Sequence, residues 1–402
     1  MVTFSRQPVN IHSKNLGRPM LTRLLSLLLL TGIAHAAPLE IKRGDHIVWI
    51  GNTFAERMQY FGEIETRLHA CYPEHDLVVR NLAWPADTVS LRPRPKDFGD
   101  IHHYLTAAKA DLILACYGFN ETWDYQGTEG LTGFETDLTS FLKDLQSKQY
   151  NGTSTPKVVL YSPLACEGTT VPDTSTRNDL LQRYTETMRK VTQTLGIPFI
   201  DLHTASQQLY QQEKTAKNTI NGIHLAAEGY ARLAPDILTN ALFAPLPAKA
   251  PLNAIRTEVL EKNQTFFDWY RTVNSFYIHG DRKNPYGTVN FPLERQKLLE
   301  MTHIRDQRIW RAARGETLPT EIDDSTTVQT PTTQPGKRGG TSPALTPAEE
   351  RAQFEVAEGF QVNLFASEED FPELRNPVAI NFDAAGRLWV ATMPSYPHAL
   401  PG

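Results

Sequence analysis

Residues His46–Phe54 read HIVWIGNTF, and this short segment indicates the fold of its region more clearly than any other. Runs of similar character follow it along the chain at Leu77–Asn81, Asp111–Cys116, Lys157–Tyr161 and Pro198–Leu202. Between these runs, apolar residues recur at steps of three and four, which is typical of amphipathic helices. Strands that are apolar on both faces and alternate with such helices indicate a parallel sheet covered on both sides. We therefore expect an α/β domain, a three-layer sandwich, over about residues 38–245.

The composition of the chain limits its function classes. Its 402 residues are enough for roughly two to three domains of about 150 residues. With 21% charged and 9% aromatic residues, the chain is typical of globular rather than disordered proteins. The 40 Lys and Arg against 45 Asp and Glu give a formal net charge of −5. Such a chain has no basic field to attract a polyanion, so we expect no nucleic-acid partner.

The N-terminus has the pattern of a secretory signal peptide. An apolar run of eleven residues, Leu24–Ala34, follows four basic residues and ends at Ala34-His35-Ala36, which predicts cleavage after Ala36. The alternative is a transmembrane anchor, but an anchor needs about 20 apolar residues. We expect export to the periplasm or the cell exterior. Loss of residues 1–36 lowers the formal charge from −5 to −9.

The remainder of the chain changes character three times. Residues 250–315 show helical periodicity with interleaved charges and predict a helical extension packed on the sheet domain. Residues 316–346 are rich in Thr, Pro, Gly and Ser and predict a mobile linker. In residues 347–402, two β-type runs separated by a turn at Gly386 predict antiparallel strands.

The cysteines are few. Cys71, Cys116 and Cys166 form an odd set without a CxxC motif, which indicates neither a disulfide framework nor a zinc site. We expect no metal and no cofactor for this chain.

Polar residues follow four of the predicted elements, at the edge where the ligands of parallel sheets gather. Thr53 stands at a sharp strand-to-helix turn, where a helix N-terminus favours developing negative charge. The alternative is that Thr53 only caps the helix. The loop Asn81–Thr88 has N–H groups that suit an anion, and Asn120 adds an amide donor. His224 precedes a later helix, with Asn221 three residues before it.

The order and content of these blocks resemble the SGNH, or GDSL-type, hydrolases. That family has Gly-Asp-Ser-Leu after the first strand, Asn-x-Gly-x-x-Gly-Asp after the second, Gly-x-Asn after the third and Asp-x-x-His near the end. The corresponding blocks here are Gly51-Asn52-Thr53-Phe54, Asn81-Leu82-Ala83-Trp84-Pro85-Ala86-Asp87, Gly118-Phe119-Asn120 and Asn221-Gly222-Ile223-His224. The resemblance covers roughly residues 46–242 and implies the α/β fold of that family.

By position, the resemblance implies that Thr53 is the nucleophile, His224 the general base and Asn221 the residue that orients the base. The oxyanion hole would consist of the N–H groups of Thr53 and Ala86 and the side chain of Asn120. Threonine stands here for serine, and its methyl group restricts χ1. Asn221 stands for aspartate and cannot stabilise an imidazolium by charge. Ala86 stands for glycine and tolerates positive φ poorly.

Three further residues are candidates for the same site. Asn52, which stands for the aspartate of the first block, is a possible pocket residue. Ser162 follows the fourth predicted strand and is another, although a turn before Pro163 is the alternative. His203 follows the fifth predicted strand and is an alternative base.

The resemblance implies an exported esterase or deacetylase that acts on a small-molecule or glycan ester, with acetylated carbohydrate as one possibility. The alternative is a glycan-binding module of the same fold with little or no catalysis. Residues Phe354–Met393 resemble the start of the β-propeller of bacterial membrane-bound dehydrogenase-type proteins. A third hypothesis therefore places the chemistry in a downstream propeller partner. No CxxCH occurs in this chain, so no haem attachment is expected.

Overall fold

The structure is a computed structural model that describes residues 38–168, 171, 173–212, 217–272, 275–281, 291–330 and 345–393. The predicted signal peptide, residues 1–36, lies outside these residues. Within them, no helix combines the length and apolar character that crossing a membrane requires.

A five-stranded parallel sheet forms the centre of the α/β domain, as the two-sided apolar runs predict. The strand order is β2-β1-β3-β4-β5, so the chain starts in the second strand position and crosses over to both sides. In the register of the sheet, Trp49 of β1 lies between Asn81 of β2 and Leu114 of β3. The strands are β1 (His46–Gly51), β2 (Val78–Asn81), β3 (Leu112–Cys116), β4 (Lys157–Tyr161) and β5 (Phe199–Ile200).

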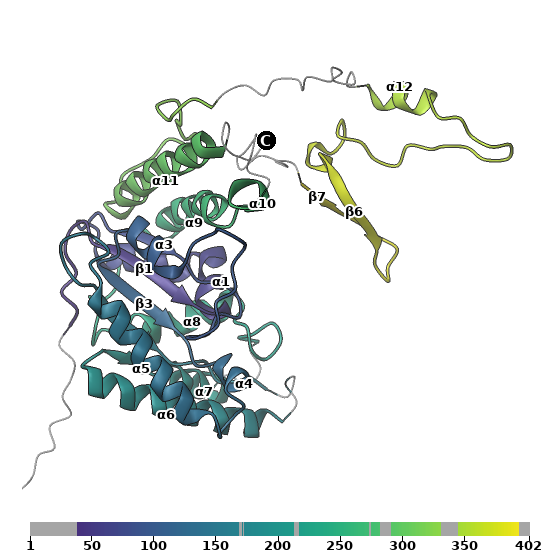
Figure 1. Ribbon diagram of the computed structural model, residues 1–402. Coiled ribbons are helices and arrows are strands. Elements are labelled where there is room, and N and C mark those ends of the chain that lie inside the picture. Colours follow the sequence, from purple (N-terminus) through teal and green to yellow (C-terminus); the bar gives the residue numbers. More distant parts are fainter. Residues whose placement is uncertain are drawn as a thin grey trace, which may run out of the picture. The chain divides into compact units, whose positions relative to one another are not determined.

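Helices cover both faces of this sheet (Figure 1). The first face packs against α1 (Thr53–Phe61), α2 (Glu63–Cys71), α7 (Leu202–Gln212) and α8 (Ala227–Ile237). The second packs against α3 (Ile101–Ala107), α5 (Leu131–Ser147) and α6 (Thr174–Leu195), while the short α4 (Glu121–Asp124) follows β3. Along β1, Ile47 and Trp49 join the first core and Val48 and Ile50 the second. The two-residue period of a strand thus explains why β1 is apolar throughout.

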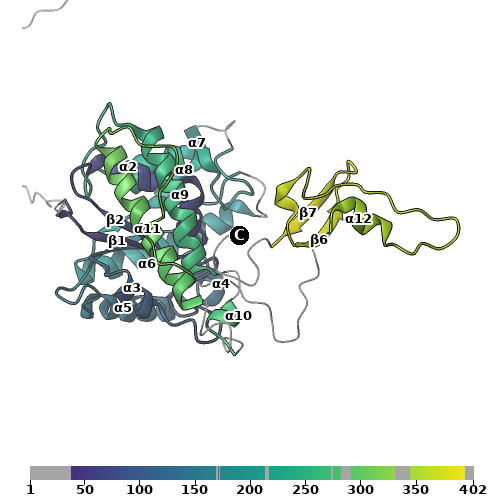
Figure 2. The same ribbon diagram turned by 90° about the horizontal axis from the view of Figure 1, so that it is seen from above.

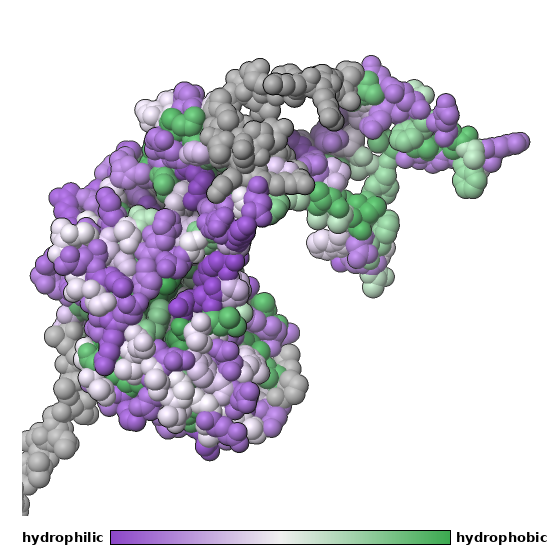
Figure 3. Space-filling view, viewed as in Figure 1, coloured by the Kyte–Doolittle hydropathy of each residue, from purple (hydrophilic) through white to green (hydrophobic). Residues whose placement is uncertain are grey.

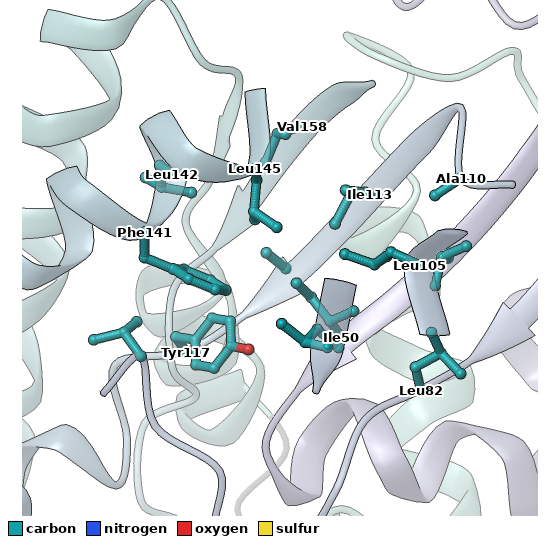
Figure 4. Packing of buried hydrophobic residues seen from close by; sticks show 14 of the residues in the cluster. Ile50, Leu82, Leu105, Ala110, Ile113, Tyr117, Phe141, Leu142, Leu145 and Val158 are labelled. Atoms are coloured by element: carbon teal, nitrogen blue, oxygen red, sulfur yellow. The ribbon is translucent and has the colours of Figure 1, made fainter. Parts of the chain in front are cut away.

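Figure 4 shows the second core at close range. Ile50, Ile113 and Val158 come from three neighbouring strands and point toward Phe141 and its neighbours on α5. All four of these side chains are buried. Burial of such side chains contributes about 1.5–3 kcal/mol each, so this layer fixes the strands whose ends form the site described below.

Two long helices, α9 (Leu252–Tyr270) and α11 (Phe291–Ala313), lie side by side, with the short α10 (Ser275–Ile278) between them in sequence (Figure 2). They occupy the range in which helical periodicity predicts an extension. Helix α9 packs on α2 and α1 and contributes Phe266, Trp269 and Tyr270 to the second core. The extension and the sheet therefore share one hydrophobic core.

Polar contacts from the same helices reach strand β2. Lys262 Nζ donates to Val79 O at 3.0 Å, and Trp310 Nε1 donates to Leu77 O at 2.8 Å. Arg80 forms a bidentate pair with Asp306, at 2.9 and 2.5 Å. These contacts tie the extension to the strand on its polar as well as its apolar side.

Residues 316–330, the described part of the predicted linker, contact α11. Asp324 accepts from Arg305 at 2.8 and 3.1 Å, and Val328 N donates to Glu300 at 2.6 Å. The rest of the predicted linker up to residue 344 lies outside the described residues.

The C-terminal segment contains α12 (Pro347–Ala352), the 3-10 turn η2 (Pro372–Leu374) and a hairpin of β6 (Pro377–Phe382) and β7 (Leu388–Thr392). The strands are antiparallel and the turn between them includes Gly386 at φ 77°, as the sequence predicts. Figure 3 shows hydrophobic residues gathered over this segment, and Phe382 and Trp389 are among those exposed. That it begins a propeller stays a prediction.

Candidate active site

The turn after β1 requires its glycine and places Thr53. Gly51 adopts φ 124°, and a Cβ there would lie only 2.0 Å from Cys116 O of the adjacent β3. Asn52 N donates to the same oxygen at 3.1 Å, while its side chain accepts from Phe54 N at 3.1 Å. Asn52 is therefore the N-cap of α1, and the alternative that Thr53 caps the helix is wrong. Thr53 is the first residue of the helix.

The hydroxyl of Thr53 faces the loop after β2. Ala86 N donates to Thr53 Oγ1 at 3.3 Å. Ala86 adopts φ 64°, a left-handed conformation that costs a non-glycine residue about 1–2 kcal/mol. Ala86 thus holds, despite its side chain, a backbone conformation that glycine adopts with less strain, and its N–H points at the hydroxyl.

The loop after β3 supplies Asn120, whose Nδ2 donates to Asp87 O at 3.4 Å. The next residue, Glu121, has no exposed surface and accepts from Gly118 N at 2.7 Å and Val89 N at 3.1 Å. Burial raises the pKa of Glu121 to about 7. One carboxyl group therefore joins the two loops that hold Ala86 and Asn120. The sequence reasoning missed this role, although a carboxylate directly after the Gly-x-Asn block was the available signal.

An ion pair fixes the second loop. Asp87 is buried and binds Arg94 through two hydrogen bonds, at 2.8 and 2.6 Å. The guanidinium of Arg94 also lies over the ring of Trp84, 4.4 Å from its centroid. These contacts hold the backbone on both sides of Ala86.

His224 lies in the loop before α8, next to Asn221. Its Nδ1 is 3.1 Å from Oδ1 and 3.0 Å from Nδ2 of Asn221, and its backbone N donates to the same Oδ1 at 3.0 Å. Burial lowers the pKa of His224, and the positive charge of Arg57 lowers it further. The imidazole is therefore neutral at neutral pH, the state that a general base needs.

Glu167 holds this loop in place, a role that the sequence reasoning also missed. Its carboxylate accepts from the backbone and side chain of Asn218, at 3.0 and 2.6 Å, and from those of Thr219, at 2.7 and 2.6 Å. Four hydrogen bonds to one carboxylate fix the backbone just before Asn221.

One cavity of about 250 Å³ brings these blocks together. Five of its lining residues are predicted site residues from loops far apart in sequence, and Ser162 is a sixth: Asn52, Thr53, Ala86, Asn120, Ser162 and His224. Asn221 lies behind His224 and does not line the cavity. Much of the remaining wall is apolar or aromatic, with Phe119, Trp123 and Tyr230 among its residues.

Ser162 lines the cavity and also forms a turn, whereas His203 has a structural position. Ser162 Oγ accepts from His203 N at 3.0 Å and donates to Pro163 O at 3.1 Å, as the turn alternative predicts. His203 is buried on α7 and is not among the residues that line the cavity. Within the described residues, no group of three or more His, Cys, Asp or Glu side chains is placed to hold a metal ion.

Residues 49–232, which span all four blocks, match the family model described as "GDSL-like Lipase/Acylhydrolase family". The match covers the part of the chain that carries the sheet and the cavity and is consistent with a GDSL-like domain there. Residues 346–402 match a second model, described as "Domain of unknown function (DUF7133)". No curated protein matches the chain. The GDSL-like domain thus includes the cavity and both loops that face Thr53.

Solved structures similar to this chain share little sequence with it. An acetylxylan esterase from Geobacillus stearothermophilus is 18% identical, with a TM-score of 0.40, and the match covers 52% of this chain and 100% of that one. A putative GDSL-like lipase from Parabacteroides merdae is 16% identical, with a TM-score of 0.41 and coverages of 51% and 98%. The α/β hydrolase LAE5 from the Lake Arreo metagenome is 18% identical, with a TM-score of 0.39 and coverages of 50% and 96%.

Proposed function

We propose that the GDSL-like domain is an esterase in which Thr53 is the nucleophile and His224 the general base. The observation that supports this most directly is the contact between Ala86 N and Thr53 Oγ1, in a cavity that Asn120 and His224 also line. A backbone donor, an amide donor, a hydroxyl and a neutral imidazole are the groups that acyl transfer requires. The family model that residues 49–232 match is described as one of lipases and acylhydrolases, which supports the same proposal.

The reaction proceeds in two steps. Thr53 Oγ1 forms a bond to the ester carbonyl carbon while His224 takes the hydroxyl proton, and the departing alcohol then receives that proton. Water, deprotonated by His224, then attacks the acyl-threonine; the bond between the acyl carbon and Thr53 Oγ1 breaks, His224 returns the proton to Oγ1, and the acid is released. The N–H groups of Thr53 and Ala86 and Nδ2 of Asn120 stabilise the negative carbonyl oxygen in both steps.

Asn221 orients the base without contributing charge. With its proton on Nδ1, His224 donates to Asn221 Oδ1 at 3.1 Å, and Nε2 keeps the lone pair that accepts the threonine proton. An amide does not stabilise the imidazolium as a carboxylate does. In the serine protease triad, replacing aspartate by asparagine lowers turnover about 10⁴-fold, so we expect a slow enzyme.

For the substrate, we propose a small acyl ester of a carbohydrate, with acetate as the acyl group. The cavity of about 250 Å³ suits a short acyl group better than a lipid chain. Trp123, 57% exposed, lies at this cavity, and a flat exposed ring offers an apolar face to a sugar.

The esterase proposal is tested with the full chain and p-nitrophenyl acetate or acetylated xylan. Thr53→Ala and His224→Ala are expected to lower kcat at least 10³-fold, because each removes a reacting group. Thr194→Ala, which changes an exposed threonine on α6, is the matched control. Wild-type turnover no higher than that of Thr53→Ala would rule out the esterase.

The uncharged Asn221 favours a second candidate, a glycan-binding module with little catalysis. This candidate predicts that wild type and Thr53→Ala bind acetylated xylooligosaccharide equally well in calorimetry and release no acetate. Release of acetate by wild type alone would contradict it.

Export and the propeller belong to the same proposal. We propose that residues 1–36 direct secretion, which N-terminal sequencing of secreted protein would test by cleavage after Ala36.

We also propose that the antiparallel hairpin β6–β7 begins a propeller blade, since a blade is built from such strands. A structure of a longer chain from the same gene would test this.

A further inference from the structure

Arg57 has no ion-pair partner among the described residues, whereas several other buried or half-buried arginines have one. Arg80, Arg94 and Arg308 each bind a carboxylate through two hydrogen bonds. Arg57 lines the cavity of the proposed esterase, and among the described residues its guanidinium makes one long hydrogen bond, 3.4 Å from Nη2 to Leu225 O. Its Nε is buried without a hydrogen-bond partner among the described residues.

The surroundings of Arg57 make this charge costly. The cavity wall is mainly apolar, and the ring of Phe61 lies 5.5 Å from the guanidinium carbon. The carboxylate of the neighbouring Glu56 accepts hydrogen bonds from Gln59 and Tyr60 and none from Arg57, so the charges of Glu56 and Arg57 interact only through space. A half-buried cation beside a cavity, without a bound carboxylate, has donors available for an anion that enters the cavity.

The position of Arg57 indicates which part of a substrate it contacts. Leu225, its hydrogen-bond partner, directly follows His224, so the guanidinium lies on the His224 side of the cavity. In ester hydrolysis the base returns its proton to the departing alcohol, and the alcohol portion therefore lies on that side. The acyl group occupies the side of the oxyanion donors.

We propose that Arg57 makes the domain specific for esters whose alcohol portion bears an anionic group, such as an acetylated sugar acid. This inference rests on the proposed esterase function and adds its substrate class. The anion binds the guanidinium while Thr53 attacks the acyl carbon, and the hydrolysis itself is unchanged. Carboxylate and sulfate share the required chemistry.

The test compares three aryl acetates of similar shape on the full chain: 4-acetoxybenzoate, 4-acetoxybenzenesulfonate and the neutral 4-acetoxybenzamide. We expect wild type to have a kcat/KM at least about tenfold higher for an anionic ester than for the amide, the range of one charge-assisted hydrogen bond. The carboxylate and sulfonate arms show which anion the site prefers.

Three variants separate charge recognition from a structural role. Arg57→Gln is expected to lose the preference for the anionic ester through a higher KM for that ester, so that the ratio of kcat/KM between the anionic and the neutral ester falls to about one. Arg57→Lys is expected to restore part of the preference, because it keeps the charge. Arg183→Gln, an exposed arginine on α6, is the matched control.

The outcomes distinguish this inference from the esterase proposal. If wild type hydrolyses neither kind of ester, the esterase proposal fails and this inference fails with it. If wild type hydrolyses all three esters equally, or Arg57→Gln lowers all three rates by one factor, the inference is wrong and the esterase stands.

Discussion

Asn221 presents both an acceptor and a donor to one nitrogen of His224: Oδ1 lies 3.1 Å and Nδ2 3.0 Å from Nδ1. The two contacts favour opposite tautomers, and only the one with the proton on Nδ1 leaves Nε2 able to act as a base. A carboxylate at position 221 would accept only, so it would select the active tautomer and stabilise the imidazolium. Asn221→Asp is therefore expected to raise kcat by about tenfold or more, as measured with p-nitrophenyl acetate. An unchanged or lower kcat in a folded Asn221→Asp protein would count against His224 as the base.

Asn120 is expected to act mainly in the transition state. Its Nδ2 makes only a long contact, 3.4 Å to Asp87 O, and lies at the cavity with Ala86 N. Asn120→Ala is expected to lower kcat by about 10²–10³-fold with little change in KM, as for loss of an oxyanion donor. Steady-state kinetics against Asn253→Ala, an exposed asparagine on α9, measure the effect. A rise in KM at constant kcat would instead assign Asn120 to substrate binding.

The pH profile of kcat/KM depends on Arg57. Burial and the charge of Arg57 lower the pKa of His224 below 6.5, so the neutral imidazole predominates to a lower pH than usual. Activity toward a neutral ester is therefore expected to persist below pH 6.5. Arg57→Gln removes one of the two causes of the lowered His224 pKa. It is therefore expected to move the acid limb of the pH profile to higher pH. A limb at the same pH in both proteins would show that it reports another group.

Glu121 makes stability depend on pH. Its pKa is raised to about 7 from 4.5, so between these values the folded protein binds a proton that the unfolded chain has lost. The stabilisation from this group is complete below about pH 4.5 and is lost as pH rises to about 7. Urea denaturation across this range is expected to show the decline in wild type and in Glu129→Gln, an exposed control, but not in Glu121→Gln. A similar decline of the free energy of unfolding in Glu121→Gln would show that other titrating groups cause the pH dependence.

The pair of Lys262 and Glu65 is buried between α9 and α2. Lys262 is 1% exposed, and its Nζ contacts Glu65 at 2.7 Å, Val79 O at 3.0 Å and Asn263 at 2.7 Å. Lys262→Met leaves the Glu65 carboxylate buried without this cation and is expected to lower the free energy of unfolding by about 3–5 kcal/mol. Lys190→Met breaks the exposed pair with Glu135 and is expected to cost less than about 1 kcal/mol. Equal losses in the two variants, measured by urea denaturation, would contradict the role of burial.

The sequence predicted the parallel sheet because its strands are apolar on both faces, which few other arrangements require. It also placed Thr53, Ala86, Asn120 and His224 near one another, since the carboxyl ends of parallel strands lie at one edge. It did not predict Glu121, Glu167 or the unpaired Arg57, because their partners are set by tertiary distances that no local pattern records.

The helical extension shows the same limit of prediction from sequence. Its helical periodicity was visible, but the contact of Lys262 with Val79, 183 residues away in sequence, was not. Charges interleaved along a helix are typical of a solvated surface, yet here Lys262 and Asp306 are buried against β2.

Strand β2 is the last strand on its side of the sheet, and Leu77 O and Val79 O point away from β1. An open strand edge of this kind is a template for pairing with a strand of another molecule. Trp310 Nε1 and Lys262 Nζ occupy these two acceptors, and the aromatic rings of α9 cover the adjoining core. The extension therefore protects the protein from edge-to-edge association, and a chain without α9 and α11 would be prone to aggregate through β2.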